Sequence, residues 1–253
     1  MLLAFVLAQI GPPTFQKFDR LQAACVIKTE VKASNGKDSG YTLTLDVVAE
    51  TEKSEGGTTT FDCGVSALRI EGTLDGRKVD AAWSKGGGWK GDGKIASLDR
   101  VLAKGWKMSL APGKGTSIGD GYLELGDLLP VFNPGVLLGY SVPPPAAPVA
   151  AGKTWEVKGQ TFPHAGGFGV RAAATFDFAE GDAARLSARL TFGKAETEIP
   201  IEGASNVKGD GYASLTYDVK KGRPLKGASS AKLVLSQGGL KKEITQVVEF
   251  EMR

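Results

Sequence analysis

The chain has 253 residues and a formal net charge of only +3, which is too small to indicate a nucleic-acid-binding surface. Hydrophobic residues make up 42% and charged residues 23%, a balance that is typical of a folded globular protein, so we do not expect a disordered chain. The length allows one large β domain or two small ones, and the 35 glycines, scattered among short β-branched and aromatic runs, predict many tight turns between short strands.

The chain begins with a segment that is similar to a secretory leader. Residues 1–8 are apolar, and Val6 and Ala8 stand at the small-residue positions that signal peptidase reads, so we expect cleavage before Gln9. Because the segment is short and has no basic start, an upstream start site and a buried first strand remain as alternatives. We expect an exported protein, periplasmic, cell-surface or secreted, with residues 1–20 as its leader and N-terminal segment.

Two cysteines, Cys25 and Cys63, are the only ones in the chain. An even pair in an exported protein is compatible with one disulfide. Two buried free thiols are the alternative, because cysteines on two β-strands need not be neighbours in space.

Alternating hydrophobicity is the main pattern in the N-terminal half, residues 21–142. It is clearest in one run, which places four apolar side chains on the same face of a predicted strand. This run contains Tyr41, Leu43, Leu45 and Val47.

A glycine-rich stretch further along combines tryptophans with lysines. Trp83, Trp89 and Lys90 fall in or beside it, and Trp106 and Lys107 follow a short distance later. Exposed indole rings can stack on sugars or bases while the ammonium groups hold anions, so these five residues form a candidate ligand-binding site. The alternative is a glycine-rich hairpin whose tryptophans fold back on the core, since tryptophan is highly buried on average.

Two short helices are predicted in the middle of the chain. Residues 95–104 have apolar residues at helical spacing, and Gly105 follows as a helix cap. Leucines between positions 123 and 129 indicate a second short helix, which Pro130 would end or kink.

A proline-rich linker, residues 143–152, separates two halves, since consecutive prolines prefer an extended conformation and cannot donate to a sheet. The C-terminal half, residues 153–253, again alternates, with tight-turn signals between its predicted strands, which favours antiparallel pairing. Its strands are marked by Phe176 and Phe178, by Leu186, Leu190 and Phe192, by Leu215, Tyr217 and Val219, by Leu233 and Leu235, and by Val248, Phe250 and Met252.

The region around this linker resembles a family of uncharacterised bacterial secreted proteins and lipoproteins. The resemblance covers about residues 143–225 and rests on the prolines 143–145, the Gly-Lys-Thr-Trp step at 152–155 and the Lys-Gly-Arg turn at 221–223. It implies an envelope location and an antiparallel sheet, and it brings no catalytic residues. The chain departs from the lipoprotein members because Cys25 has no convincing lipid-attachment sequence before it.

Catalytic chemistry finds little support in the residues. The sequence Gly-Thr-Ser-Ile-Gly at 115–119 has the spacing of a nucleophile elbow around Ser117, and His164 is the single histidine that could act as its base. The surrounding alternation predicts strands and turns, where an elbow needs a strand-to-helix turn. One histidine and two separated cysteines also do not make a zinc site.

The sequence therefore predicts a mainly β fold, a large antiparallel sandwich or partly open β-barrel with one or two short helices. We expect a non-catalytic accessory protein that needs no cofactor and binds a lipid, a glycan or an envelope protein. An apolar ligand would lie on a concave sheet face, lined by Leu43, Leu45, Phe176 and Leu190. The alternatives are a structural or interaction scaffold with a filled core and, third, a serine hydrolase.

Overall fold

The fold is mainly antiparallel β, as the alternating pattern predicts. A computed structural model describes residues 9–118, 125, 128–129, 131–132, 134–142, 144–160, 168–178, 182–194 and 206–253. Thirteen strands form one large sheet, which is not closed into a barrel, and two short strands form a separate pair. Among the described helices, none has the length and apolar character that crossing a membrane requires.

The strands of the N-terminal half precede the linker. They are β1 (Gln9–Ile10), β2 (Arg20–Ala33), β3 (Ser39–Glu55), β4 (Thr58–Leu74), β5 (Arg77–Ser84), β6 (Gly88–Asp92), β7 (Trp106–Ala111) and β8 (Gly115–Ile118). The later strands are β9 (Val149–Ala150), β10 (Thr154–Gln160), β11 (Phe168–Phe178), β12 (Ala183–Lys194), β13 (Asn206–Asp218), β14 (Arg223–Gln237) and β15 (Leu240–Met252). The helices are η1 (Ala96–Leu98), α1 (Asp99–Lys104) and η2 (Pro134–Leu138), of which η1 and η2 are 3₁₀ helices.

Both halves of the chain contribute to the same sheet. Its strand order is β10-β11-β12-β13-β14-β15-β2-β3-β4-β5-β6, and each neighbouring pair is antiparallel. The last strand, β15, pairs with β2 and so joins the two halves without a break in the ladder. Within the linker, β9 pairs with β1 beside the main sheet.

The sheet divides at β4. The second part of β4 pairs with β5, whereas Thr59 to Cys63 pair with β7, and a register shift near Ala67 lies between the two parts. The short helix α1 connects β6 to β7 and contacts β4, in the region where the sequence predicted a helix over 95–104. Gly105 ends it with a φ of 68°, and a Cβ there would lie 2.0 Å from the carbonyl oxygen of Cys63, so only glycine fits.

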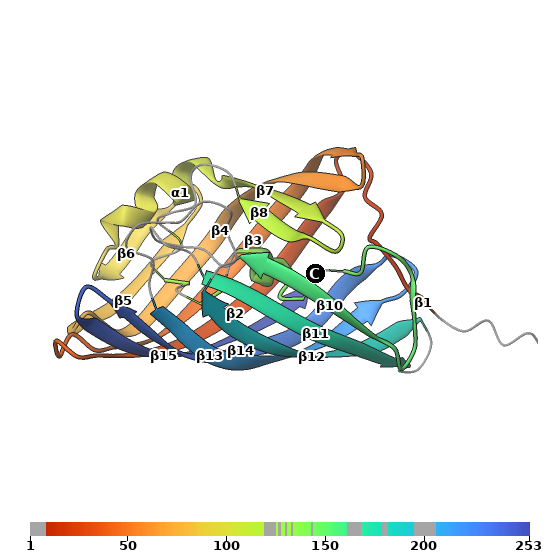
Figure 1. Cartoon of the computed structure of the whole chain (residues 1–253). Coiled ribbons are helices and arrows are strands. Elements are labelled where there is room, and N and C mark those ends of the chain that lie inside the picture. Colours follow the sequence, from red (N-terminus) through yellow and green to blue (C-terminus); the bar gives the residue numbers. More distant parts are fainter. Residues whose placement is uncertain are drawn as a thin grey trace, which may run out of the picture.

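The sheet curves around an apolar interior. In Figure 1 the strands β12 to β15 run along the bottom of the molecule and the β7-β8 hairpin lies at the top. Along each strand, buried side chains alternate with exposed ones, because successive Cβ atoms point to opposite faces. Leu43, Leu45, Phe176 and Leu190 all lie on the buried face, each at most 1% exposed.

An irregular segment of the chain's own backbone fills the concave face. We call the described residues between 125 and 142 the inner segment. It contains η2, which lies against β2 and β15, and its described part contains no strand. Its buried apolar side chains are Leu125, Leu128, Leu129, Val131, Phe132, Val136, Leu137, Leu138, Tyr140 and Val142.

One detail of the sequence prediction is wrong, and another lies mostly outside the described residues. The disulfide prediction is wrong, since Cys25 and Cys63 are free and buried. Strand β3 lies between them and pairs Leu45 with Cys25 and Ala49 with Cys63. Two strand spacings place their Cα atoms about 10 Å apart or more, beyond the reach of a disulfide. The second predicted helix lies mostly outside the described residues.

Candidate functional site

The predicted tryptophan and lysine site does not assemble. Trp89 pairs with Trp83 on the inner face and Trp106 is 3% exposed, whereas Lys90 and Lys107 point outward. Each lysine directly follows a tryptophan in a strand, so the two must lie on opposite faces of the sheet. The alternative interpretation, in which the tryptophans fold back on the core, is the one that the structure shows.

The two tryptophans of the β5-β6 edge, Trp83 and Trp89, are partly buried, and Trp89 is held by a polar contact. The Trp89 Nε1 donates to Asp99 Oδ1 at 2.8 Å, and Lys94 Nζ lies 2.8 Å from Asp99 Oδ2. These hydrogen bonds, from Lys94 first and then from Trp89, lower the pKa of the Asp99 carboxyl. The edge is therefore fastened to the start of α1 and presents no open stacking platform.

The concave face, by contrast, contains no buried charged residue within the described part of the chain. The described part of the chain buries six polar residues that carry no formal charge, namely Thr29, Ser39, Thr51, Thr59, Ser229 and Gln246. An ionised group placed among them would lose its hydration without gaining a counter-ion. The chemistry of this face is thus apolar contact supplemented by neutral hydrogen bonds.

Three of the inward polar side chains form one row across the sheet. Gln246 of β15 pairs with Thr29 of β2, and Thr29 pairs with Tyr41 of β3, so the three residues stand side by side on the concave face. The Gln246 Nε2 donates to Thr29 Oγ1 at 2.8 Å. We call Gln246, Thr29 and Tyr41 the polar row.

Two members of the polar row bind the same atom of the inner segment. The Tyr41 hydroxyl donates to the carbonyl oxygen of Leu128 at 3.0 Å, and Gln246 Nε2 approaches the same oxygen at 3.3 Å. A carbonyl oxygen has two lone pairs, so it can accept both hydrogen bonds. The row therefore provides two converging neutral donors at the middle of an apolar face.

Two polar atoms near this row have no hydrogen-bond partner within the described part of the chain. They are the Gln246 Oε1 and the Ser229 Oγ, and both residues are at most 1% exposed. Ser229 pairs with Val248, two positions from Gln246 on the same face of β15, so the two side chains are diagonal neighbours. Buried polar atoms are usually satisfied, so these two call for a further donor or a bound molecule.

The other end of the inner segment is held mainly by packing. The Cys25 thiol donates to the carbonyl oxygen of Leu137 at 3.1 Å, and burial raises the pKa of this thiol to about 12. Gly139 has a φ of 79°, and a Cβ at that position would lie 2.5 Å from the Phe250 ring and 2.6 Å from Pro224. The backbone of the segment thus lies directly on the sheet at this point.

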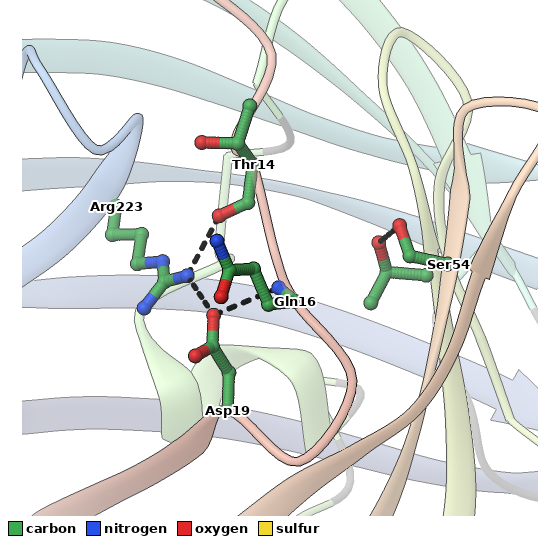
Figure 2. Close-up of polar contacts among 6 residues, drawn as sticks. Thr14, Gln16, Asp19, Ser54 and Arg223 are labelled. Carbon is green, nitrogen blue, oxygen red and sulfur yellow. Dashed lines mark hydrogen bonds and ion pairs between the residues drawn. The ribbon is translucent and has the colours of Figure 1, made fainter.

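A second polar cluster fastens the residues before β2, which we call the N-terminal strap (residues 11–19). Figure 2 shows the Arg223 guanidinium between the carbonyl oxygen of Thr14 and the carboxylate of Asp19, with Gln16 beside them. The Gln16 backbone N–H, followed by Arg223, holds the pKa of Asp19 below its usual value. The guanidinium also stacks over the Phe15 ring, 4.3 Å from its centroid. All of these contacts join segments of the chain, which makes the cluster a structural clamp.

The nucleophile-elbow alternative for Ser117, against which the surrounding alternation argues, is not supported. Ser117 lies within β8 and pairs with Ser109 of β7, where an elbow requires a sharp strand-to-helix turn. His164 lies outside the described residues. Among the residues that the structure describes, no three His, Cys, Asp or Glu side chains gather in a way that could hold a metal ion.

Comparison with known proteins gives a likeness of fold. No protein-family model and no curated protein matches the chain. A solved structure described as lipid–protein interactions in lipovitellin matches 95% of this chain with a TM-score of 0.55 and 7% sequence identity. The match covers 25% of the lipovitellin chain, and at this identity it shows a shared fold alone. The β domain of the Bordetella autotransporter BrkA also matches, with 9% identity over 92% of this chain and 98% of that domain, at a TM-score of 0.26.

The sequence reasoning missed the polar row. A signal for it was present, because Thr29, Tyr41 and Gln246 occupy inward positions of strands whose inward residues are mostly apolar. The pairing that brings Gln246 beside Thr29 joins residues 217 positions apart. Only the strand order of the folded sheet reveals it.

Proposed function

We propose that the protein is a non-catalytic carrier that binds an apolar ligand on the concave face of its sheet, at the place that the inner segment occupies. One observation supports this most directly. The apolar face of a thirteen-stranded sheet is covered by an irregular segment in place of a second sheet. The segment is attached through apolar side chains and a few side-chain hydrogen bonds, and an acyl chain can replace contacts of this kind.

The backbone hydrogen bonds of the inner segment are consistent with such a replacement. Leu128 N–H donates to Leu125, Gly139 N–H to Val136 and Tyr140 N–H to Gly135, so these bonds close turns within the segment itself. The segment can keep them when it leaves the sheet. Its release then costs chiefly apolar burial, which an incoming ligand restores.

The likeness to lipovitellin supports the choice of a lipid as the ligand. The matched structure is one of lipid–protein interactions in lipovitellin, and the shared fold extends over nearly all of this chain. A function outside the cytoplasm, expected from the leader-like start, is part of the same proposal. An envelope location makes an apolar ligand available to a protein with such a face.

A structural module with a filled core is the second candidate. The complete burial of Leu43, Leu45 and Phe176 favours it, since a filled interior needs no ligand. The two candidates differ in what happens when the inner segment is loosened. A carrier should bind its ligand more tightly, whereas a filled module should only lose stability.

The experiment uses Phe132→Ala, which shortens a buried ring of the inner segment that packs edge-on against Phe192 of β12, and follows saturable binding of a fluorescent acyl probe. The matched control is Phe61→Ala in β4, a buried ring that packs against Phe15 of the N-terminal strap and makes no contact of this kind with the described part of the inner segment. Both variants should lose about 3–5 kcal/mol of stability.

The carrier predicts that the wild type binds the probe and that Phe132→Ala, unlike Phe61→Ala, binds it several-fold more tightly. Native mass spectrometry of the wild type purified from its producing cells should also show bound lipid. A protein without lipid and without saturable probe binding in any variant would establish the filled module instead.

A further inference from the structure

We infer that the ligand is a neutral acyl ester, whose carbonyl oxygen takes the place of the Leu128 carbonyl between Tyr41 and Gln246. This inference rests on the proposed carrier function and names the class of lipid. In the structure, the inner segment presents an apolar chain with one carbonyl oxygen at the polar row. An acyl ester has the same two features.

The position of the donors supports a carbonyl oxygen as their partner. The Tyr41 hydroxyl and the Gln246 amide come from β3 and β15, which lie on either side of β2, and they converge on one oxygen at 3.0 and 3.3 Å. The hydrogen bond from Gln246 Nε2 to Thr29 also orients the amide, so that its nitrogen faces this oxygen. Two donors held in this way recognise an acceptor with two lone pairs.

The lack of buried charged residues in the described part of the concave face favours a ligand with a neutral head group. No buried residue of the described chain carries a charge, so a carboxylate or phosphate at the polar row would be buried without a counter-ion. Burial of an unpaired ion costs far more than two neutral hydrogen bonds return. An ester therefore fits the face, and a free fatty-acid anion does not.

The unpartnered atoms next to the row extend the same inference. Gln246 Oε1 accepts no hydrogen bond within the described residues, and Ser229 Oγ has no partner there either. A hydroxyl close to the ester, as in a partial glyceride, can donate to Gln246 Oε1 or bond with Ser229. We therefore expect a hydroxy ester to bind more tightly than a simple ester.

The inner segment and the ester compete for the same donors. When an ester replaces the segment, Tyr41 and Gln246 donate to its carbonyl oxygen as they now donate to that of Leu128, whereas a hydrocarbon offers no acceptor and both of these hydrogen bonds are lost. An unpaired buried donor is costly, and one neutral hydrogen bond corresponds to about a 2–10-fold change in affinity. The wild type should therefore prefer an ester to a hydrocarbon of similar size by about tenfold or more.

The test measures dissociation constants for methyl laurate, pentadecane, monolaurin and the laurate anion by displacement of a fluorescent acyl probe. We expect monolaurin to bind most tightly, then methyl laurate, with pentadecane and laurate at least about tenfold weaker. In the double variant Tyr41→Phe with Gln246→Met, the preference for methyl laurate over pentadecane should fall to about one, chiefly because pentadecane binds more tightly.

The matched control is Tyr217→Phe, which removes another buried inward hydroxyl, one that donates to the carbonyl oxygen of Gly222 at the far end of β13. It should keep the wild-type preference. An unchanged preference in the double variant overturns the inference. If that variant does not fold, equal affinity of the wild type for methyl laurate and pentadecane overturns it as well. Failure of the wild type to bind any of the four compounds instead contradicts the carrier function itself.

Discussion

The centre of the sheet and its β5-β6 edge contain similar kinds of side chain, but these side chains form different surfaces. Both combine aromatic or apolar side chains with hydrogen-bonding groups, yet at the edge the polar partners are charged and half-exposed, as Lys94 and Asp99 are. At the centre the polar groups are neutral and buried, and two of them converge on one backbone oxygen. Whether such residues form a charged, half-exposed edge or a neutral, buried face thus depends on which face of the sheet they occupy more than on which residues lie together in the sequence.

The largest expected difference between the two regions is in how their contributions to stability depend on alkaline pH. The Cys25 thiol has a pKa of about 12 in the folded protein against an ordinary value of 9.0, so between these pH values the unfolded chain loses a proton that the folded chain keeps. The free energy of unfolding should therefore fall as the pH rises from about 9 to about 12, with this thiol alone contributing up to about 4 kcal/mol of the fall. Urea unfolding across this range, with Cys25→Ala showing a shallower slope, checks the prediction, and equal slopes would contradict it.

The contribution of the β5-β6 edge to stability should depend on acid pH instead. The pKa of Asp99 is lowered by its hydrogen bonds, so its contribution is present above the ordinary carboxyl pKa and is lost as the pH falls through the lowered value. In urea unfolding at a series of acid pH values, Asp99→Asn should remove this acid-dependent part of the stability curve and leave the alkaline part unchanged.

Packing at the centre should tolerate no added atom. Gly139→Ala places a methyl group against the Phe250 ring and forces a left-handed backbone onto alanine, so we expect a loss of about 2–4 kcal/mol. Thermal unfolding measures it. Gly86→Ala is the control at the edge, because Gly86 also has a positive φ, of 84°, while a methyl group added there would have nothing within 4 Å. The control should show the backbone cost alone, and equal losses in both variants would argue against close contact of the inner segment with the sheet.

A single hydroxyl at the polar row should have a smaller effect on stability. Tyr41→Phe removes one of the two hydrogen bonds to the Leu128 carbonyl, for which we expect a loss of about 1 kcal/mol. Urea unfolding at neutral pH is the measurement. A loss of several kcal/mol would mean that Tyr41 supports more of the core than this one contact.

The lysines that the sequence first suggested as ligand contacts should have the smallest effect. Lys90→Ala changes an exposed side chain on the outer face of β6, so stability and affinity for an acyl probe should stay within error of the wild type. A clear loss of probe binding would indicate that the β5-β6 edge contributes to ligand binding.

The sequence predicted the strand-rich, antiparallel fold because period-2 alternation and glycine turns are local signals. It also located the helix over 95–104 and its end at Gly105 from local spacing. The same alternation could have excluded the paired use of Trp89 with Lys90, since neighbours along a strand point to opposite faces.

The remaining features depend on contacts that no local pattern encodes. The pairing of β15 with β2 joins the two ends of the chain, and it alone places Gln246 beside Thr29. The docking of the inner segment likewise follows from the curvature of the whole sheet. The separation of Cys25 and Cys63, by contrast, follows from the consecutive strands β2, β3 and β4, in which β3 lies between the two cysteines.

Hydrogen exchange of the inner segment, with and without methyl laurate, tests the central claim most directly. If the ligand replaces the segment on the concave face, the turn hydrogen bonds of the Gly139 and Tyr140 amides lose the burial that shields them from water. These amides should then exchange faster when the ligand is bound, while those of β2 and β15 stay protected. Slower or unchanged exchange of these amides under saturating ligand would show that the segment stays in place and would contradict the account.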